Sequence, residues 1–587
     1  MLKLFKNFTK KEVILLFLSI IFIVIQVWLE LKMPDYMAEI TKLVETEGSQ
    51  MSDILNNGKY MLLCALGSLI SMVFVIYFVS TIAANLSKNI RKKLFDKVEN
   101  MAINEVKKFS TSSLITRSTN DITQIQMLLS MGLHLIIKSP ITATWAIVKI
   151  MNKSWEWSAM TGVAVVLMMS IVSAIMLIVV PKFKILQKLT DKINGVTREN
   201  LTGIRVVRAF NAEKYQENKF EKVNHDLTKM QLFNQKCFSI IMPLMFCTMN
   251  ILTLLVYFVG ANLINRAALV DKLSIFGNMI VFSSYAIQVI LSFLMLAFIF
   301  MMWPRGQVSA KRINEVLDEE ITIKDGKLKT GKRGESGTVE FRNVSFKYPD
   351  AEEYLLNDIN FKVNKGDFVA IIGLTGSGKS TLINLIPRFY DVTEGEVLVD
   401  GRNVKEYTEE ALHNKIGYVP QKAVIFDGSV HFNVAYGDNG KGEISEKKVR
   451  EAVEVAQAKE FVEKMDLRYD THISQGGTNL SGGQKQRLSI ARAIARNPEI
   501  YIFDDSFSAL DYKTDATLRR ELRNYAKNAT IMVVAQRIGT VMNADKIIVL
   551  KDGKMVGMGN HKELLESCEI YKEIALSQLT KEELENA

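Results

Sequence analysis

The sequence predicts a chain of two unlike parts, an α-helical membrane part followed by a water-soluble α/β part. The mean hydropathy, +0.11, is high for a soluble protein and low for a protein that lies wholly within a membrane. Long stretches without Asp, Glu, Lys or Arg lie before residue 305, whereas short strand-like runs begin after residue 338. The first part is expected to cross the membrane six times, with long cytoplasmic helical extensions.

Composition excludes several protein classes for this chain of 587 residues. Hydrophobic residues make up 48%, enough to bury a core, which excludes a mainly disordered chain. With 33 Gly, 9 Pro and 4 Cys, collagen-like and disulfide-scaffold classes are excluded as well. The net charge is +10, which fits either a nucleic-acid partner or a membrane protein with basic cytoplasmic loops. The position of the basic residues decides between these two.

Six segments are expected to span the membrane, because a helix of about 20 apolar residues crosses a bilayer core. The first follows four lysines, as a signal peptide would. It leads into Trp28-Leu29-Glu30, which is no small-residue cleavage site, so we interpret it as an uncleaved span. The third is the weakest because it carries His134, Lys138 and Lys149. Within a membrane domain of residues 1–305, the expected spans are 12–32, 58–86, 128–150, 157–180, 237–265 and 273–304.

The charge pattern predicts the topology. Residues 85–121 carry eight basic and four acidic side chains, and residues 182–236 carry twelve and six, so both segments are expected in the cytoplasm. An even number of spans must separate them, which supports the third span. Residues 30–58 carry six acids and two lysines, which is typical of an outer loop. We therefore expect a multi-pass protein of the plasma (inner) membrane with a cytoplasmic N-terminus. Lys138 and Lys149 either line a polar pathway or face water, and we favour the second.

A Gly-rich motif in the soluble part predicts a nucleotide site. After a linker, residues 306–337, the soluble domain is expected over residues 338–578. Its run Phe368–Ile372 leads into a sequence that matches GxxxxGK[ST] and precedes a helical run, which is the context that this motif requires. Lys379 is expected to reach the phosphates, and Ser380 to bind Mg²⁺. The nucleotide-binding residues expected here are Gly373, Thr375, Gly376, Ser377, Gly378, Lys379, Ser380 and Thr381.

Two carboxylates follow a second buried strand, residues 500–503. Asp504 is placed to bind Mg²⁺ directly or through water, and Asp505 is placed to polarise an attacking water. The four cysteines are dispersed without a CxxC pair, so they indicate no metal or redox centre.

Five consecutive residues between these motifs carry a family resemblance: Leu480, Ser481, Gly482, Gly483 and Gln484. With this LSGGQ sequence the chain resembles an ATP-binding cassette (ABC) transporter of the exporter type over essentially its whole length. The resemblance implies ATP and Mg²⁺ as cofactors and a dimer with two composite sites. In each site, the GxxxxGK[ST] loop (P-loop) of one chain meets the LSGGQ signature of the other.

The resemblance also implies roles for further residues. Tyr348 corresponds to the aromatic residue that stacks on adenine, and Gln421 to a residue that contacts nucleotide and Mg²⁺. Ser508 and Asp511 correspond to the D-loop. Segments near Ser112 and Asn211 correspond to the coupling helices at the tips of the cytoplasmic extensions.

Two catalytic positions depart from the family pattern. Asp505 stands where the family has Glu, and Gln536 stands where it has His in the switch loop. Asp is one methylene shorter, and displacing a catalytic group by about 1 Å can cost on the order of 10²-fold in rate. Gln forms hydrogen bonds but carries no proton or positive charge. The chain thus resembles the degenerate-site subunit of a heterodimeric multidrug exporter.

The leading hypothesis is an ATP hydrolase coupled to export of small lipophilic or drug-like compounds from the cytoplasm or inner leaflet, with an impaired site of its own. A second exporter half and the lipid bilayer are its expected partners. The alternatives are a homodimeric lipid or peptide flippase and a nucleotide-gated sensor. A soluble ATPase acting on nucleic acid is excluded, because such a protein has no reason to carry the charge-free runs.

Overall fold

The computed structural model describes residues 3, 8–46, 48–151, 155–267 and 269–579, and the chain forms two compact units. The membrane unit comprises the described residues of 1–99 and 109–319. The cassette unit comprises those of 100–108 and 320–587. The short segment 100–108 therefore belongs with the cassette although it lies between two membrane helices in the sequence.

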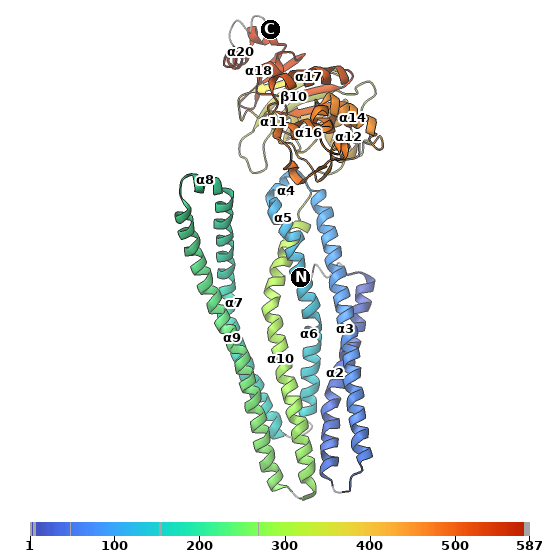
Figure 1. Ribbon diagram of the computed structural model, residues 1–587, viewed down its shortest axis with the longest axis vertical. Coiled ribbons are helices and arrows are strands. Elements are labelled where there is room, and N and C mark those ends of the chain that lie inside the picture. The colour runs from blue at the N-terminus through green and yellow to red at the C-terminus, as the bar shows by residue number, and fades with distance from the viewer. Residues whose placement is uncertain (1–2, 4–7, 47, 152–154, 268, 580–587) are drawn as a thin grey trace. The chain divides into compact units, whose positions relative to one another are not determined.

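Nine helices make up the chain before residue 318 within the described ranges (Figure 1). They are α2 Lys10–Glu45, α3 Met51–Glu99, α4 Ile103–Phe109, α5 Thr111–Ser118, α6 Asn120–Met151, α7 Trp155–Thr202, α8 Ile204–Ala209, α9 Glu213–Arg266 and α10 Leu269–Leu317. The short α8 joins the ends of the long neighbouring helices α7 and α9 (Figure 1).

Six of these helical stretches are long and apolar enough to cross a membrane. The six-span fold class that the sequence predicts is thereby confirmed, and the exact domain limits remain a proposal. Helices α2, α3, α6 and α10 pack together, and their core includes Val27, Val79, Phe282 and Tyr285. Many outward side chains are exposed and apolar, as expected for a lipid-facing surface.

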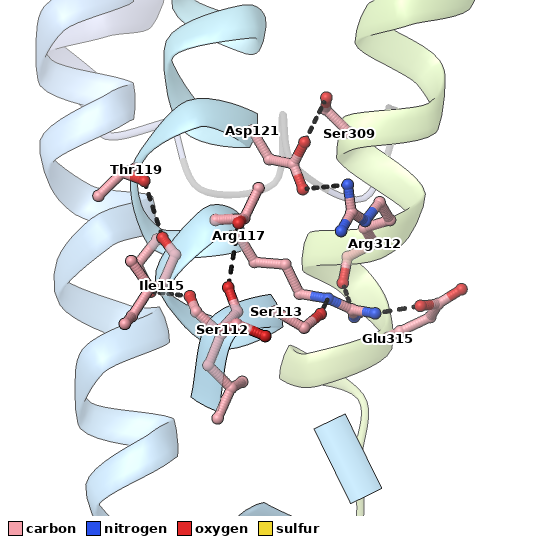
Figure 2. Close-up of polar contacts among 12 residues, drawn as sticks. Ser112, Ser113, Ile115, Arg117, Thr119, Asp121, Ser309, Arg312 and Glu315 are labelled. Carbon is pink, nitrogen blue, oxygen red and sulfur yellow. Dashed lines mark hydrogen bonds and ion pairs between the residues drawn. The ribbon is translucent and has the colours of Figure 1, made fainter. Parts of the chain in front are cut away.

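A polar cluster joins α10 to the helix pair α5–α6 (Figure 2). Asp121, which is buried, accepts a hydrogen bond from Ser309 Oγ at 2.9 Å and lies 3.4 Å from the guanidinium of Arg312. Arg117 pairs with Glu315 at 3.1 Å and donates to the carbonyl of Arg312 at 2.5 Å. Because a buried carboxylate needs partners, this cluster fixes the last turns of α10 against α5 and α6.

The cassette unit contains a mixed six-stranded sheet in the order β12-β11-β3-β10-β9-β6, and a four-stranded sheet in the order β2-β1-β4-β5. A short pair, β7-β8, completes the strands of the described residues. The strands are β1 Val339–Phe346, β2 Leu356–Val363, β3 Phe368–Gly373, β4 Glu394–Val399, β5 Arg402–Asn403, β6 Ile416–Val419, β7 Gly428–Ser429, β8 His472–Ile473, β9 Ile500–Asp504, β10 Thr530–Val534, β11 Lys546–Lys551 and β12 Lys554–Gly559.

Helices pack against both faces of the six-stranded sheet, because each of its two cores contains helix residues. Residues of β3 alternate between two cores: Phe368 and Ala370 pack in one, Val369 and Ile371 in the other. The helices are α11 Lys379–Asn384, α12 Glu409–Asn414, α13 Val430–Val434, α14 Glu446–Val455, α15 Lys459–Glu463, α16 Gly482–Ala495, α17 Tyr512–Tyr525, α18 Ile538–Val541, α19 His561–Ser567 and α20 Glu569–Leu576, with 3₁₀ turns at Val404–Glu406, Arg468–Asp470 and Gln475–Gly477.

The sheet brings distant loops together. Strands β11, β3, β10, β9 and β6 run parallel, so their carboxyl ends meet along one edge. Ligand sites in open α/β sheets form at this edge. The loops that follow β3, β10, β9 and β6 contain the motifs that the sequence singles out.

Candidate nucleotide site

The loop after β3 requires its glycines. Gly376 and Gly378 have φ of 86° and 92°, which L-residues with side chains rarely adopt. A Cβ at Gly373 would lie 2.2 Å from the carbonyl of Leu550 on the neighbouring strand. The loop therefore stays close to the sheet and exposes backbone N–H groups, the arrangement that holds phosphates.

Lys379, the first residue of α11, points back into this loop. Its ammonium donates to the carbonyls of Gly373 at 2.8 Å and Leu374 at 2.7 Å. Burial lowers the pKa of Lys379, while the nearby Asp505 and Asp504 carboxylates oppose that shift. The ammonium is thus held at the centre of the loop, where it would meet the phosphates of a nucleotide.

Ser380 and Asp504 form a pair of oxygen ligands suited to Mg²⁺. Ser380 Oγ donates to Asp504 Oδ1 at 2.7 Å, and the residue Asp504 is 6% exposed. Burial raises the pKa of Asp504, so a bound cation would be favoured there. A hydroxyl and a carboxylate are ligands that Mg²⁺ accepts beside phosphate oxygens, so these residues fit the ion that the sequence predicts.

Asp505 lies between two amide side chains. Its Oδ2 accepts from Gln536 Nε2 at 2.8 Å and from Gln421 Nε2 at 3.3 Å. The sheet register explains this, since Val534 pairs with Asp504 across β10 and β9, and β6 borders β9 on the other side. Asp505 is buried and has φ of 47°. The carboxylate is therefore anchored by neighbours that cannot take up a proton.

Tyr348 follows β1 and lies beside this loop. Its hydroxyl is 3.0 Å from Thr381 Oγ1, and its ring makes an edge contact with that of Tyr390. Lys107 of α4 lies over both rings, 6.0 Å from the centroid of Tyr348 and 5.7 Å from that of Tyr390. Lys107 also donates to Tyr390 Oη at 3.0 Å, a hydrogen bond that raises the pKa of Lys107.

Lys107 is a residue that the sequence analysis missed. It lies more than 240 residues before Tyr348, and no local motif links the two. The sequence feature that comes closest to indicating Lys107 is the excess of basic side chains in residues 85–121. The structure also places helices α4 and α8 just before the expected tips near Ser112 and Asn211.

The signature residues form a separate, exposed helix start. Ser481 caps α16: its hydroxyl accepts from Gln484 N–H at 3.3 Å, and Gln484 Oε1 accepts from Ser481 N–H at 2.9 Å. This is a capping box, which fixes the start of the helix. Ser481 and Gly482 are exposed, whereas Leu480 packs against the core.

The D-loop lies next to the signature. A Cβ at Gly483 would lie 3.4 Å from the carbonyl of Ala509. Ser508 Oγ donates to the carbonyl of Asp505 at 2.9 Å, and Asp511 caps α17 through Thr514 N–H, which lowers the pKa of Asp511. Among the described residues, no hydrogen bond joins the signature to the P-loop. The structure thus brings together two sets: the P-loop with Asp504, Asp505, Gln421 and Gln536, and the signature with the D-loop.

Comparison with known proteins identifies this arrangement. Residues 16–305 match the ABC transporter transmembrane region, and residues 356–508 match the ABC transporter family. An uncharacterized ABC transporter ATP-binding protein of Mycobacterium tuberculosis (strain ATCC 25618 / H37Rv) is 38% identical over 522 residues, 88% of this chain and 86% of the relative. The chain belongs to the ABC transporter family.

Two further similarities refine the fold of this ABC transporter. The ATP-dependent lipid A-core flippase of Escherichia coli (strain K12) is 30% identical over 502 residues, 85% of this chain and 84% of the flippase. The structure of a bacterial Atm1-family ABC exporter with ATP bound covers 95% of this chain and 97% of its own, with a TM-score of 0.78 and 24% identity. That structure confirms the fused exporter fold.

The family defines the general activity. The protein is a multi-pass inner-membrane exporter with a cytoplasmic ATP-binding cassette, and it uses ATP with Mg²⁺. Hydrolysis of ATP is coupled to transport. The basic surplus of the sequence is accordingly a topology signal, as the charge pattern predicts.

Proposed function

We propose that this chain is the degenerate-site half of a heterodimeric exporter for lipophilic or drug-like compounds. Its own P-loop, Asp504, Asp505 and Gln536 make a slow site, which the signature of the partner closes. Its signature and D-loop complete the main catalytic site on the partner. The chain thus binds ATP at one site and supports hydrolysis at the other.

The proposal gives the following roles to the site residues. The P-loop residues, 373 and 375–381, cradle the phosphates; Tyr348 stacks on adenine; Ser380, Asp504 and Gln421 hold Mg²⁺. Asp505 and Gln536 occupy the catalytic positions. Leu480, Ser481, Gly482, Gly483 and Gln484 contact the nucleotide on the partner, together with Ser508 and Asp511 of the D-loop.

The contact between Gln536 and Asp505 supports the proposal most strongly. A carboxylate that polarises water needs a free oxygen close to that water. Gln536 and Gln421 both donate to Asp505 Oδ2, so the two amides hold this short carboxylate in place and leave Oδ1 as the oxygen that could face a water. Asp505 is shorter than the Glu of the family, and Gln536 carries no transferable proton as His does. The geometry therefore favours retention of bound nucleotide over its rapid hydrolysis.

Hydrolysis by the purified full chain tests the proposal. We expect the chain alone in lipid vesicles to hydrolyse ATP at least about 100-fold more slowly than its complex with a half that carries Glu and His at these positions. The double variant Asp505→Glu, Gln536→His should raise the rate of the chain alone. Rapid hydrolysis by the unmodified chain alone would contradict the heterodimer.

One observation favours a second candidate, a homodimeric lipid or peptide flippase. The E. coli relative, 30% identical, is a lipid A-core flippase. In that case, the chain alone would hydrolyse ATP rapidly and move a labelled lipid between the leaflets of a vesicle. The same hydrolysis measurement therefore separates the two candidates.

A further inference from the structure

Gln578, which follows α20, contacts the loop that carries Gln536. Its Nε2 donates to the backbone carbonyl of Gln536 at 2.7 Å, and its Oε1 accepts from the backbone N–H of Ile538 at 2.8 Å. One amide side chain therefore bridges the backbone on both sides of Arg537. The bridge uses both the donor and the acceptor of the amide, so it fixes the loop at two points.

The bond to Ile538 satisfies a group that the loop cannot satisfy by itself. Ile538 begins the short helix α18, and the first N–H groups of a helix have no partner within that helix. Within the described residues, Arg537 at the N-cap position makes no capping hydrogen bond through its side chain. Gln578 thus supplies the missing acceptor, although it lies 40 residues later in the chain.

The segment that holds Gln578 is anchored in the cassette core. Tyr571 and Ala575 of α20 are fully buried, and Leu579 packs against the same core. The backbone N–H groups of Gln578 and Leu579 both donate to the carbonyl of Ala575, at 3.1 and 2.9 Å. The side chain of Gln578 is exposed, but it therefore reaches the loop from a fixed base.

The bridged loop lies at the catalytic positions. Gln536 Nε2 donates to Asp505 Oδ2 at 2.8 Å, and Asp505 lies close enough to the P-loop to act electrostatically on Lys379. Gln536 and Arg537 are both exposed, so packing alone does not immobilise them. Functional side chains keep their geometry when neighbours that are themselves fixed hold them by hydrogen bonds. Gln578 is such a neighbour.

We propose that Gln578 is a positioning residue, which holds this loop so that the amide of Gln536 can donate to the γ-phosphate of ATP bound to the same chain. The proposal rests on the role of Gln536 in the proposed function above. Gln578 itself touches no nucleotide and acts through Gln536. Without the bridge, the loop would sample other positions, and the contact with the γ-phosphate would weaken.

Binding of two nucleotides tests the proposal, because ATP carries a γ-phosphate and ADP does not. The full chain in nanodiscs is titrated with the non-hydrolysable analogue AMP-PNP and with ADP, each with Mg²⁺. Gln578→Met keeps the length of the side chain and removes both hydrogen bonds. We expect AMP-PNP to bind about five- to tenfold more weakly to this variant, and ADP to bind with unchanged affinity. Equal losses for both nucleotides, or no loss for either, would overturn the proposal.

A double-mutant cycle shows whether Gln578 acts through Gln536. Gln536→Ala removes the amide that would contact the γ-phosphate, so it should weaken AMP-PNP binding by itself. Adding Gln578→Met to Gln536→Ala should then cause no further loss, because there is no longer a side chain to position. Losses that add in the double variant would contradict the proposal.

Amide hydrogen exchange separates positioning from folding. In Gln578→Met, exchange should become faster in residues 535–541 and stay slow in the buried strand β10. Faster exchange in both segments would indicate a structural role and refute the positioning role. Lys572→Met, at an exposed position of α20, is the matched control and should leave both affinities and the exchange unchanged.

These measurements are independent of the heterodimer. AMP-PNP is not hydrolysed, so its affinity does not depend on which site turns over faster. Rapid hydrolysis by the chain alone would refute the heterodimer and leave the role of Gln578 intact. Conversely, equal losses of AMP-PNP and ADP binding would refute the role of Gln578 and leave the heterodimer intact.

Discussion

The two nucleotide-facing regions of the cassette differ in how their polar groups are used. In the P-loop region the functional groups contact one another: Lys379 donates to its own loop, Ser380 to Asp504, and Gln536 to Asp505. In the signature region, Ser481 and Gly482 are exposed, and the capping box fixes the helix start. The P-loop region forms internal contacts and departs from the family pattern at two catalytic positions. The signature region keeps all five LSGGQ residues and is exposed, so it can contact a second chain.

The proposed heterodimer assigns a different task to each of these two regions. A signature acts on the nucleotide of another chain, so it is retained as long as that partner hydrolyses ATP. Catalytic groups act on the chain's own nucleotide, so they can change when this site only binds. Substitutions in the two regions should therefore have very different effects on the assembled transporter.

A charge at the signature should give the largest effect. Gly482 has open space around the position of a Cβ, so Gly482→Asp is compatible with the fold. The added carboxylate would face the phosphates on the partner, and removal of such electrostatic stabilisation typically costs about 10²–10³-fold in rate. We expect ATP hydrolysis by the assembled pair to fall about 100-fold or more.

Gly482→Ser serves as the control for this change, because it adds a small side chain without charge. It should retain most of the activity. Binding of a fluorescent ATP analogue to the P-loop of this chain alone should be the same in both variants. Normal hydrolysis by the Gly482→Asp pair would show that this signature contributes to no active site.

A smaller effect is expected at Lys107. Its ammonium lies over Tyr348 and donates to Tyr390, so it orders the ring that is proposed to take the base. A cation–π contact contributes about 0.5–1 kcal/mol at an exposed site, which corresponds to a two- to fivefold change in affinity. Lys107→Met should weaken ATP binding to this chain by that factor, whereas Lys107→Arg should restore most of it. Equal affinities for all three proteins would show that Lys107 does not order the ring.

The protonation of Asp504 predicts a pH-dependent effect on stability. Burial raises the pKa of Asp504, so the folded cassette holds this proton more tightly than the unfolded chain. Stability contributed by this group therefore falls as pH rises from the ordinary pKa through the raised one. Without nucleotide, Asp504→Asn should raise the melting temperature at neutral pH by a few degrees and leave it unchanged near pH 3.

Thermal unfolding of the full chain across this pH range measures the effect. Asp466→Asn is the control, because Asp466 is exposed. A melting temperature that changes equally at both pH values would mean that the carboxylate is not destabilised by burial.

The sequence predicts contiguous features of this molecule well and distant contacts poorly. The loop from Gly373 to Ser380 and the signature are local, so their residues and spacing reveal both. The contact between Gln536 and Asp505 depends on which strands are neighbours, and strand order cannot be read from either segment alone. Lys107 beside Tyr348 and Lys138 beside Glu30 join positions far apart in the chain, where charge and periodicity indicate no partner.

The smallest effect is expected at Asp505 itself. Asp505→Asn keeps the size of the side chain and an oxygen that accepts from Gln536, so the structure should be unchanged. It removes the charge that a catalytic carboxylate requires. If the partner's site carries the turnover, hydrolysis by the pair should change by less than about twofold, while Glu→Gln at the equivalent position of the partner should reduce it about 100-fold or more. Rates of the two single variants, measured in the same vesicles, compare the sites directly. Equal losses would show that both sites hydrolyse ATP, and that the short carboxylate between its two amides is a working catalyst.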